Sequence, residues 1–135
     1  MIQWAEILET GYPEIDTDHR RLVDECNGLT RLVSGRGSWN DVVEASGALA
    51  RNFIEHFRTE EQVLDRTEFP RAQAHKMQHR QFEEQLNRLT GFLSGADGSQ
   101  PEHWNAVKAL RDTVVDILFR HDLDYKSHLE QAAGH

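Results

Sequence analysis

The segment WNDVVEASGALARNFIEHFRTEEQVLDR, residues 39–66, is the part of the sequence that decides the fold. Its apolar side chains recur at intervals of three, four and seven residues, which places them on one face of an α-helix. That face also carries a histidine and a glutamate four residues apart, and in order along the chain it reads Val42, Leu49, Phe53, His56, Glu60 and Leu64. We therefore predict a long amphipathic helix over 39–66 whose buried side includes an imidazole and a carboxylate.

The rest of the chain shows the same helical periodicity, and β-branched and polar residues alternate nowhere for long. Gly, Ser and Pro residues divide it, with Pro70 and Pro101 placed where a helix tolerates proline in its first turn. We predict an N-terminal arm over 1–15 and helices over about 16–34, 39–66, 70–93 and 101–132. Four long helices with short connections indicate an all-α fold, an antiparallel up-down-up-down four-helix bundle, in one domain over 1–135.

Composition and charge exclude several classes of function. The net charge of −8, without any basic run, argues against a nucleic-acid or anionic-membrane partner. No stretch approaches the roughly 20 apolar residues of a membrane span, and the first residues do not resemble a signal peptide. The one cysteine, Cys26, suits a reducing compartment, so we expect a cytoplasmic protein.

The eight histidines are the unusual feature of the composition. A single buried histidine is usually a satisfied core residue, and an isolated pair four residues apart often arises by chance on a helix surface. Here the predicted inward faces of all four helices carry such groups together. The set consists of four imidazoles and two carboxylates, His19, His56, Glu60, His75, His79 and Asp122.

Burying this set without a cation would cost several kcal/mol in poorly satisfied polar groups. It holds too many ligands for one tetrahedral zinc ion and suits two first-row ions that favour octahedral coordination, such as iron. The Glu-x-x-His signature of ferritin-like di-iron bundles does not occur in the sequence. The sequence suggests neither a Gly-rich loop for phosphate binding nor a Ser/His/Asp arrangement for nucleophilic catalysis.

Several spaced motifs, added to this set, resemble one family. They are Trp4, the segment IDTDHRRL over 15–22 followed by Asn27, HFRTEE over 56–61, HKMQHRQF over 75–82, and DLDYKSHL over 122–129. The chain resembles the bacterial hemerythrins, non-haem di-iron four-helix bundles that bind oxygen, from Trp4 through Leu129. A single hemerythrin-like domain is what this resemblance implies.

The resemblance also implies a role for each candidate residue. His19 and His56 would bind one of two non-haem iron ions, and His75 and His79 the other. Two carboxylates, Glu60 and Asp122, would bridge the ions alongside an oxo or hydroxo group. An apolar pocket for dioxygen would be lined by Phe57, Phe82, Val114, Ile117 and Leu118.

The sequence departs from the family at residue 117. The family places a fifth histidine five residues before the bridging aspartate, and this chain has Ile117 there. Ile117 is then a pocket-lining aliphatic side chain where a ligand was lost. His121, one turn further along, either replaces the lost ligand or donates a hydrogen bond to a carboxylate. Glu61 is interpreted as an ordinary surface charge, and Tyr125 as a core tyrosine whose hydroxyl needs a partner.

Three functions follow from this reading. The favoured one is reversible binding of dioxygen (or nitric oxide) for carriage, storage or sensing, without an enzymatic role and with any signalling partner protein left unspecified. The second is a di-iron redox enzyme with peroxidase-like or oxidase activity, which an open iron position permits. The third is an iron-handling bundle with a partly degraded site.

Overall fold

The computed structural model describes residues 9–133, and the side chains of residues 121–123 and 133 lie outside the described set. Within 9–133 the regular structure is entirely helical. The elements are α1 (Pro13–Ser34), α2 (Trp39–Arg66), α3 (Ala72–Ser94), α4 (Pro101–Asp116), a π-helical turn (Ile117–His121), a 3-10 turn (Asp122–Tyr125) and α5 (Lys126–Ala133). No helix in this part of the chain is long and apolar enough to cross a membrane.

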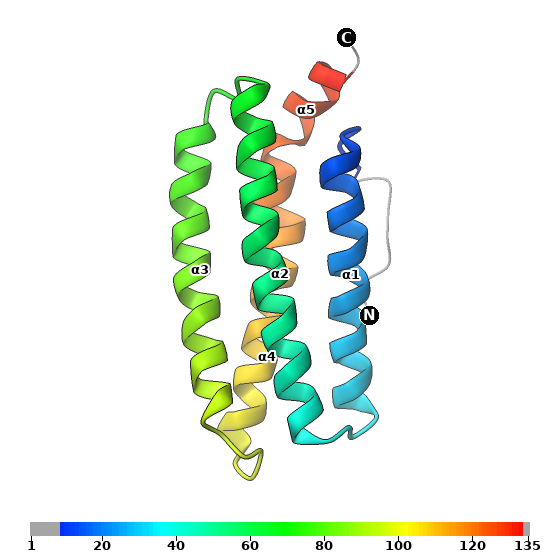
Figure 1. Ribbon diagram of the computed structural model, residues 1–135, viewed down its shortest axis with the longest axis vertical. Coiled ribbons are helices and arrows are strands. Elements are labelled where there is room, and N and C mark those ends of the chain that lie inside the picture. Colours follow the sequence, from blue (N-terminus) through cyan, green and yellow to red (C-terminus); the bar gives the residue numbers. More distant parts are fainter. Residues whose placement is uncertain (1–8, 134–135) are drawn as a thin grey trace.

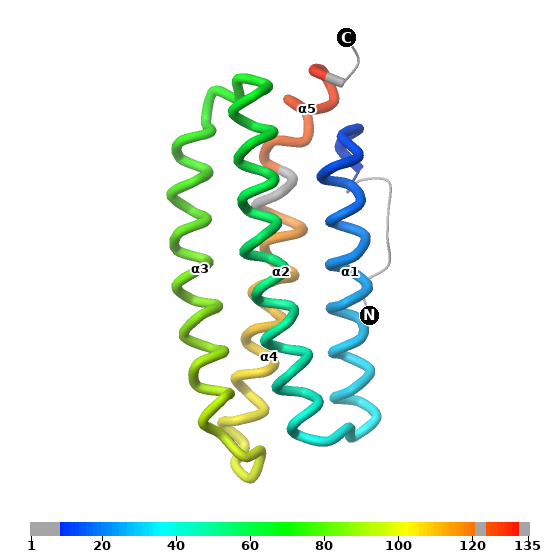
Figure 2. Tube along the Cα trace, viewed as in Figure 1, coloured from blue at the N-terminus to red at the C-terminus, as the bar shows by residue number. Residues whose placement is uncertain are grey.

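The four long helices stand side by side as a bundle (Figure 1). Contacts join α1 to α2, α2 to α3, and α3 to α4, so helices that follow one another in the sequence are also neighbours in space. Figure 2 shows the chain path through α4, which runs behind α2 and also contacts it. The helices therefore enclose a common core, and α5 leans away from the axis of α4 at one end (Figure 1).

Two of the predicted helix boundaries are displaced by local hydrogen bonding. α1 begins at Pro13 instead of residue 16, because the Asp16 carboxylate accepts hydrogen bonds from the backbone of Thr10 and Gly11 and ties the preceding turn to the first helical turn. α3 begins at Ala72, two residues after the predicted start at Pro70. The buried Phe69 holds this turn, and its carbonyl accepts from the Ala72 amide at 3.1 Å.

The predicted single helix over 101–132 is wrong. α4 ends at Asp116 and is followed by the π-helical and 3-10 turns before α5 begins. A π turn takes more residues than an α-helical turn and a 3-10 turn takes fewer, so the pair shifts side chains around the axis. The segment ends at Tyr125, whose hydroxyl reaches the buried carboxylate of Glu60. No Gly or Pro lies in this stretch, so the usual sequence signals of a break are missing.

The core consists of two apolar clusters with a polar layer between them. The smaller cluster comprises Ile15, Val63, Leu64, Phe69, Tyr125 and Leu129. The larger one is built from residues such as Leu22, Phe53, Phe57, Leu86, Val114 and Leu118. On α1 and α2 the buried histidines and Glu60 come between residues of the two clusters in sequence, so apolar packing closes the polar layer from both ends.

The connection from α3 to α4 is held against the bundle by two tryptophans. The indole of Trp39 donates to the Ala96 carbonyl at 2.8 Å, and that of Trp104 donates to the Gly98 carbonyl at 2.9 Å. Gly98 has a φ of +79°, and a Cβ built there would lie 2.8 Å from ring atoms of Trp39. Glycine is therefore required at this position by both backbone conformation and space.

Replacing Gly98 with alanine should lower the free energy of unfolding by about 1–3 kcal/mol, because the substitution strains the backbone and displaces Trp39. Chemical denaturation followed by circular dichroism measures the change. The matched control is Gly91→Ala in α3, where an added Cβ meets nothing within 4 Å. That variant should be stabilised by about 0.5–1 kcal/mol. Equal denaturation midpoints for the two variants would show that the contact with Trp39 does not constrain the loop.

Candidate metal centre

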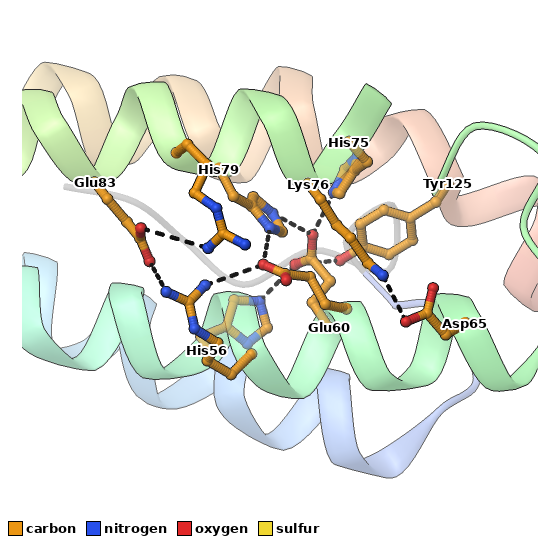
Figure 3. A network of polar contacts seen from close by, with 11 residues as sticks. His56, Glu60, Asp65, His75, Lys76, His79, Glu83 and Tyr125 are labelled. Atoms are coloured by element: carbon orange, nitrogen blue, oxygen red, sulfur yellow. Dashed lines mark hydrogen bonds and ion pairs between the residues drawn. The ribbon is translucent and has the colours of Figure 1, made fainter. Parts of the chain in front are cut away.

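The centre of the polar layer is the carboxylate of Glu60 on α2, which is fully buried. Its Oε1 lies 2.5 Å from Nε2 of His75 and 3.0 Å from Nε2 of His79. Its Oε2 lies 2.9 Å from Nε2 of His56 and accepts a hydrogen bond of 2.9 Å from the Tyr125 hydroxyl. Figure 3 shows these side chains converging on Glu60 from α2, α3 and the 3-10 turn. One carboxylate thus faces imidazoles with both of its oxygens.

The histidines form two ligand sets that share this carboxylate. His19, His56 and Glu60 present ligand atoms within 4.8 Å of one another, and so do Glu60, His75 and His79. The paired rings lie close together, with centroids 4.6 Å apart for His19 and His56 and 4.6 Å apart for His75 and His79. All five side chains are buried. The arrangement has the donor types and the proximity that two adjoining metal ions need.

Helical spacing explains how the chain delivers these groups. His56 and Glu60 lie one turn apart on α2, and His75 and His79 lie one turn apart on α3, so each pair projects from one helix face. His19 faces the same layer from α1. These five predicted residues are therefore brought together by the packing of three helices.

Two further carboxylates hold the outer edges of the imidazoles. Nδ1 of His56 lies 3.1 Å from Oδ2 of Asp18, and Nδ1 of His79 lies 2.8 Å from Oε2 of Glu61. An Nδ1–H that donates outwards leaves the Nε2 lone pair directed at Glu60, which is the tautomer a metal ligand uses. A lone pair facing a carboxylate oxygen is repulsive unless a cation lies between them. The donor set therefore fits a bound metal ion between each Nε2 and Glu60. Without metal, a proton on each Nε2 would take its place.

The electrostatics of Glu60 follow from the same contacts. Burial alone would raise its pKa, but hydrogen bonds with His56, His75 and His79 outweigh that effect and hold the pKa well below its usual range. The hydrogen bond with His56 likewise lowers the pKa of Asp18, against a smaller opposing effect of burial. Both carboxylates are ionised near neutral pH, so the layer attracts a cation.

The side chains of the other two predicted polar groups lie outside the described residues. These are Asp122, the second bridging carboxylate, and His121, the possible replacement ligand. Their backbone is described, with His121 ending the π-helical turn and Asp122 opening the 3-10 turn. Of the two predicted bridging carboxylates, the described part of the chain therefore includes only Glu60.

The apolar residues predicted to line a ligand pocket pack beside the histidines. The Phe57 ring stacks on the His79 ring, with ring centroids 4.2 Å apart and an angle of 13° between the ring planes. The ring centroids of Phe82 and Phe57 are 6.4 Å apart. The remaining three are fully buried in the same apolar cluster, Val114, Ile117 and Leu118. Their role as a pocket stays a prediction.

Sequence reasoning missed part of the centre. The interpretation of Glu61 as a surface charge is wrong, because its side chain is 11% exposed and bonds to His79. Arg58 pairs with the same carboxylate at 3.2 Å. Neither Glu61 nor Asp18 shares a helix with the histidine it contacts, so no spacing within one helix reveals the contact. The partner that Tyr125 was expected to need is Glu60.

A helical bundle whose interior gathers imidazoles around a carboxylate is typical of metal-binding helical proteins. The hemerythrin HHE cation binding domain matches residues 10–132, and the chain belongs to this family. Bacteriohemerythrin of Stenotrophomonas maltophilia (strain R551-3) is 26% identical over 144 residues, which cover 98% of this chain and 87% of that protein. Myohemerythrin-1 of Phascolopsis gouldii is 22% identical over 126 residues, 93% of this chain and 92% of that protein. The family resemblance inferred from the motifs is confirmed.

Replacing Asp18 with asparagine should weaken metal binding by about 10–100-fold, because the neutral amide no longer supports the basicity and orientation of His56. Anaerobic titration of the metal-free protein with ferrous iron against a chromophoric chelator measures the affinity. Asp24→Asn is the control, since it makes the same charge change at an exposed position of α1. Equal affinities for the two variants would mean that Asp18 does not orient a ligand.

Proposed function

We propose that this chain is an antiparallel up-down-up-down four-helix bundle that holds two non-haem iron ions and binds dioxygen, or nitric oxide, reversibly. The observation that carries the proposal is the position of Glu60, which faces His56 with one oxygen and His75 and His79 with the other. A carboxylate shared between two histidine sets is the arrangement expected of a bridging ligand. Membership of the hemerythrin family supports the same assignment.

The ligands divide into two sets under this proposal. His19 and His56 would hold one iron, His75 and His79 would hold the other, and Glu60 would be the ligand that the two sets share. Asp122 is assigned as the second bridge on the strength of the family motif. When bound, the two ions supply reversible oxidation-state changes and open positions for a small ligand.

The surroundings favour binding of a small neutral ligand. Phe57 covers one face of His79, and Val114, Ile117 and Leu118 supply further buried apolar surface. Such a lining excludes water and lowers the local dielectric constant, which suits an uncharged diatomic molecule. Binding for carriage, storage or sensing is therefore our first assignment, ahead of enzymatic turnover.

We place this activity in the cytoplasm, because the one cysteine suits a reducing compartment. Cys26 is 1% exposed, and burial raises the pKa of its thiol. A buried neutral thiol acts as a small apolar core residue and takes no part in the proposed chemistry.

A second candidate is di-iron redox catalysis, and residue 117 is the observation that favours it. Ile117 is fully buried where the family pattern has a ligating histidine. The iron held by His75 and His79 then has one protein ligand fewer. An additional open position would admit water or an added anion and make the reduced centre easier to oxidise irreversibly.

Protein produced with ample iron should contain about two iron ions per chain, as the two ligand sets require. Air exposure followed by deoxygenation should give reversible absorption changes, and a chelator should lower the melting temperature, because ligand loss removes linked stability. His79→Ala should reduce the iron content, whereas His128→Ala, which alters a histidine bonded to Thr67, should not. An iron content near one ion per chain, or a preference for zinc, would contradict the di-iron assignment.

Replacing Ile117 with histidine should slow irreversible oxidation of the reduced centre several-fold and weaken azide binding, because the new imidazole would occupy the open position. Stopped-flow and equilibrium absorption measurements test both effects, with Ile117→Leu as an apolar control. If His121 already fills the gap, His121→Ala will accelerate oxidation and Ile117→His alone will change little. Unchanged behaviour in every variant would show that this position does not set the reactivity of the centre.

A further inference from the structure

A polar cavity of about 500 Å³ opens beside the candidate centre, between α3 and the segment that follows α4. His75 lines it together with the amide side chains of Gln78 and Gln81 and the guanidinium groups of Arg71 and Arg120. A cavity of this volume is in the range of small-molecule sites. Ala74 and Phe82 also line it, and its charged and amide groups distinguish it from the apolar surroundings of Phe57.

His75 connects this cavity to the centre. Among the described residues that line the cavity it is the only buried one, with 2% of its surface exposed. The other edge of its ring faces the centre, because its Nε2 lies 2.5 Å from Oε1 of Glu60. Among the described side chains, the imidazole of His75 thus links the cavity to Glu60.

The charged side chains described at the mouth form two ion pairs. Arg71 lies 2.7 Å from Asp124, and Arg120 lies 3.1 Å from Asp116. All four residues line the cavity, and their formal charges cancel. The whole chain carries a charge of −8, so an approaching anion meets less repulsion here than over most of the surface. Guanidinium and amide groups also supply hydrogen-bond donors suited to small anions.

We propose that this cavity is the entry path and holding site for small monovalent anions, the class that includes azide and nitrite, on the His75 side of the centre. The proposal rests on the proposed di-iron function. Neutral diatomic ligands reach the centre through its apolar surroundings, whereas anions use the polar cavity. The anion would arrive at the iron that lacks a histidine at position 117, where an open position can accept it.

The first test compares association rates of azide with the iron-loaded protein by stopped-flow absorption. Arg120→Glu should slow azide association by about tenfold at low salt, because it makes the mouth net negative. This decrease in the azide association rate should be smaller at high ionic strength. Arg120 is 84% exposed, so the substitution should leave folding unchanged, which circular dichroism checks. Nitric oxide association should be the same in the variant and in the wild type, because nitric oxide carries no charge.

The matched control is Arg88→Glu, an exposed position on α3 that does not line the cavity. It makes the same change in net charge and should retain the wild-type azide rate. Equal slowing in both glutamate variants would mean that net charge acts without a specific path and would overturn the proposal. A wild-type rate in Arg120→Glu would overturn it equally.

A second measurement does not depend on iron. Azide added to the isotope-labelled, metal-free protein should shift the side-chain amide resonances of Gln78 and Gln81, and these shifts should be lost in Arg120→Glu. If the wild type binds no iron but these shifts appear, the di-iron function fails and the cavity remains an anion site. If iron binds and the shifts are absent, the proposal for the cavity is wrong.

Discussion

A carboxylate in the middle of a protein core must be compensated by positive charge, and the arrangement of the bundle interior depends on that need at Glu60. An isolated ionised carboxylate in a dry interior is far less stable than in water. Here three imidazole nitrogens lie within 3.0 Å of its oxygens and keep it ionised despite complete burial. The groups that stabilise the anion are also those that a transition-metal ion takes as ligands. Charge compensation and metal binding therefore impose one requirement on the same side chains.

The fold meets this requirement by enclosing the polar layer between two apolar clusters. Along α1, Ile15 of the smaller cluster precedes His19 and Leu22 of the larger cluster follows it, so the helix passes from one cluster to the other through the histidine. Apolar packing at both ends keeps water from competing for the ligand atoms. Asp18 and Glu61 close the sides, where they orient two imidazoles. The irregular turns after α4 lie at the same level and bring Tyr125 to Glu60.

The helical periodicity of the sequence was sufficient to predict which residues share one helix face. It was insufficient to predict which residues make contact between helices. α2 has the predicted bounds, Trp39–Arg66, and the five described candidate ligands converge as expected. The interpretation of Glu61 failed because its partner, His79, lies on another helix. The break after Asp116 was invisible because no Gly or Pro marks it in the sequence. The family resemblance supplied the prediction that Asp122 is a bridging ligand, which helical spacing alone does not indicate.

The two halves of the candidate centre differ in their surroundings while sharing one ligand. The His56 half is held from outside by Asp18, whereas the other half has Glu61 behind His79 and a polar cavity beside His75. Both oxygens of Glu60 are committed, one to each half. Under the proposed di-iron function, an anion bound on the His75 side would reduce the positive charge that this side presents to Glu60, and the carboxylate would interact more strongly with the His56 side. Because binding free energies are reciprocal, a change on the His56 side would alter anion binding on the His75 side by the same free energy. Under that proposal, a shared carboxylate would couple ligand binding at one half to the electronic state of the other, without any movement of the helices.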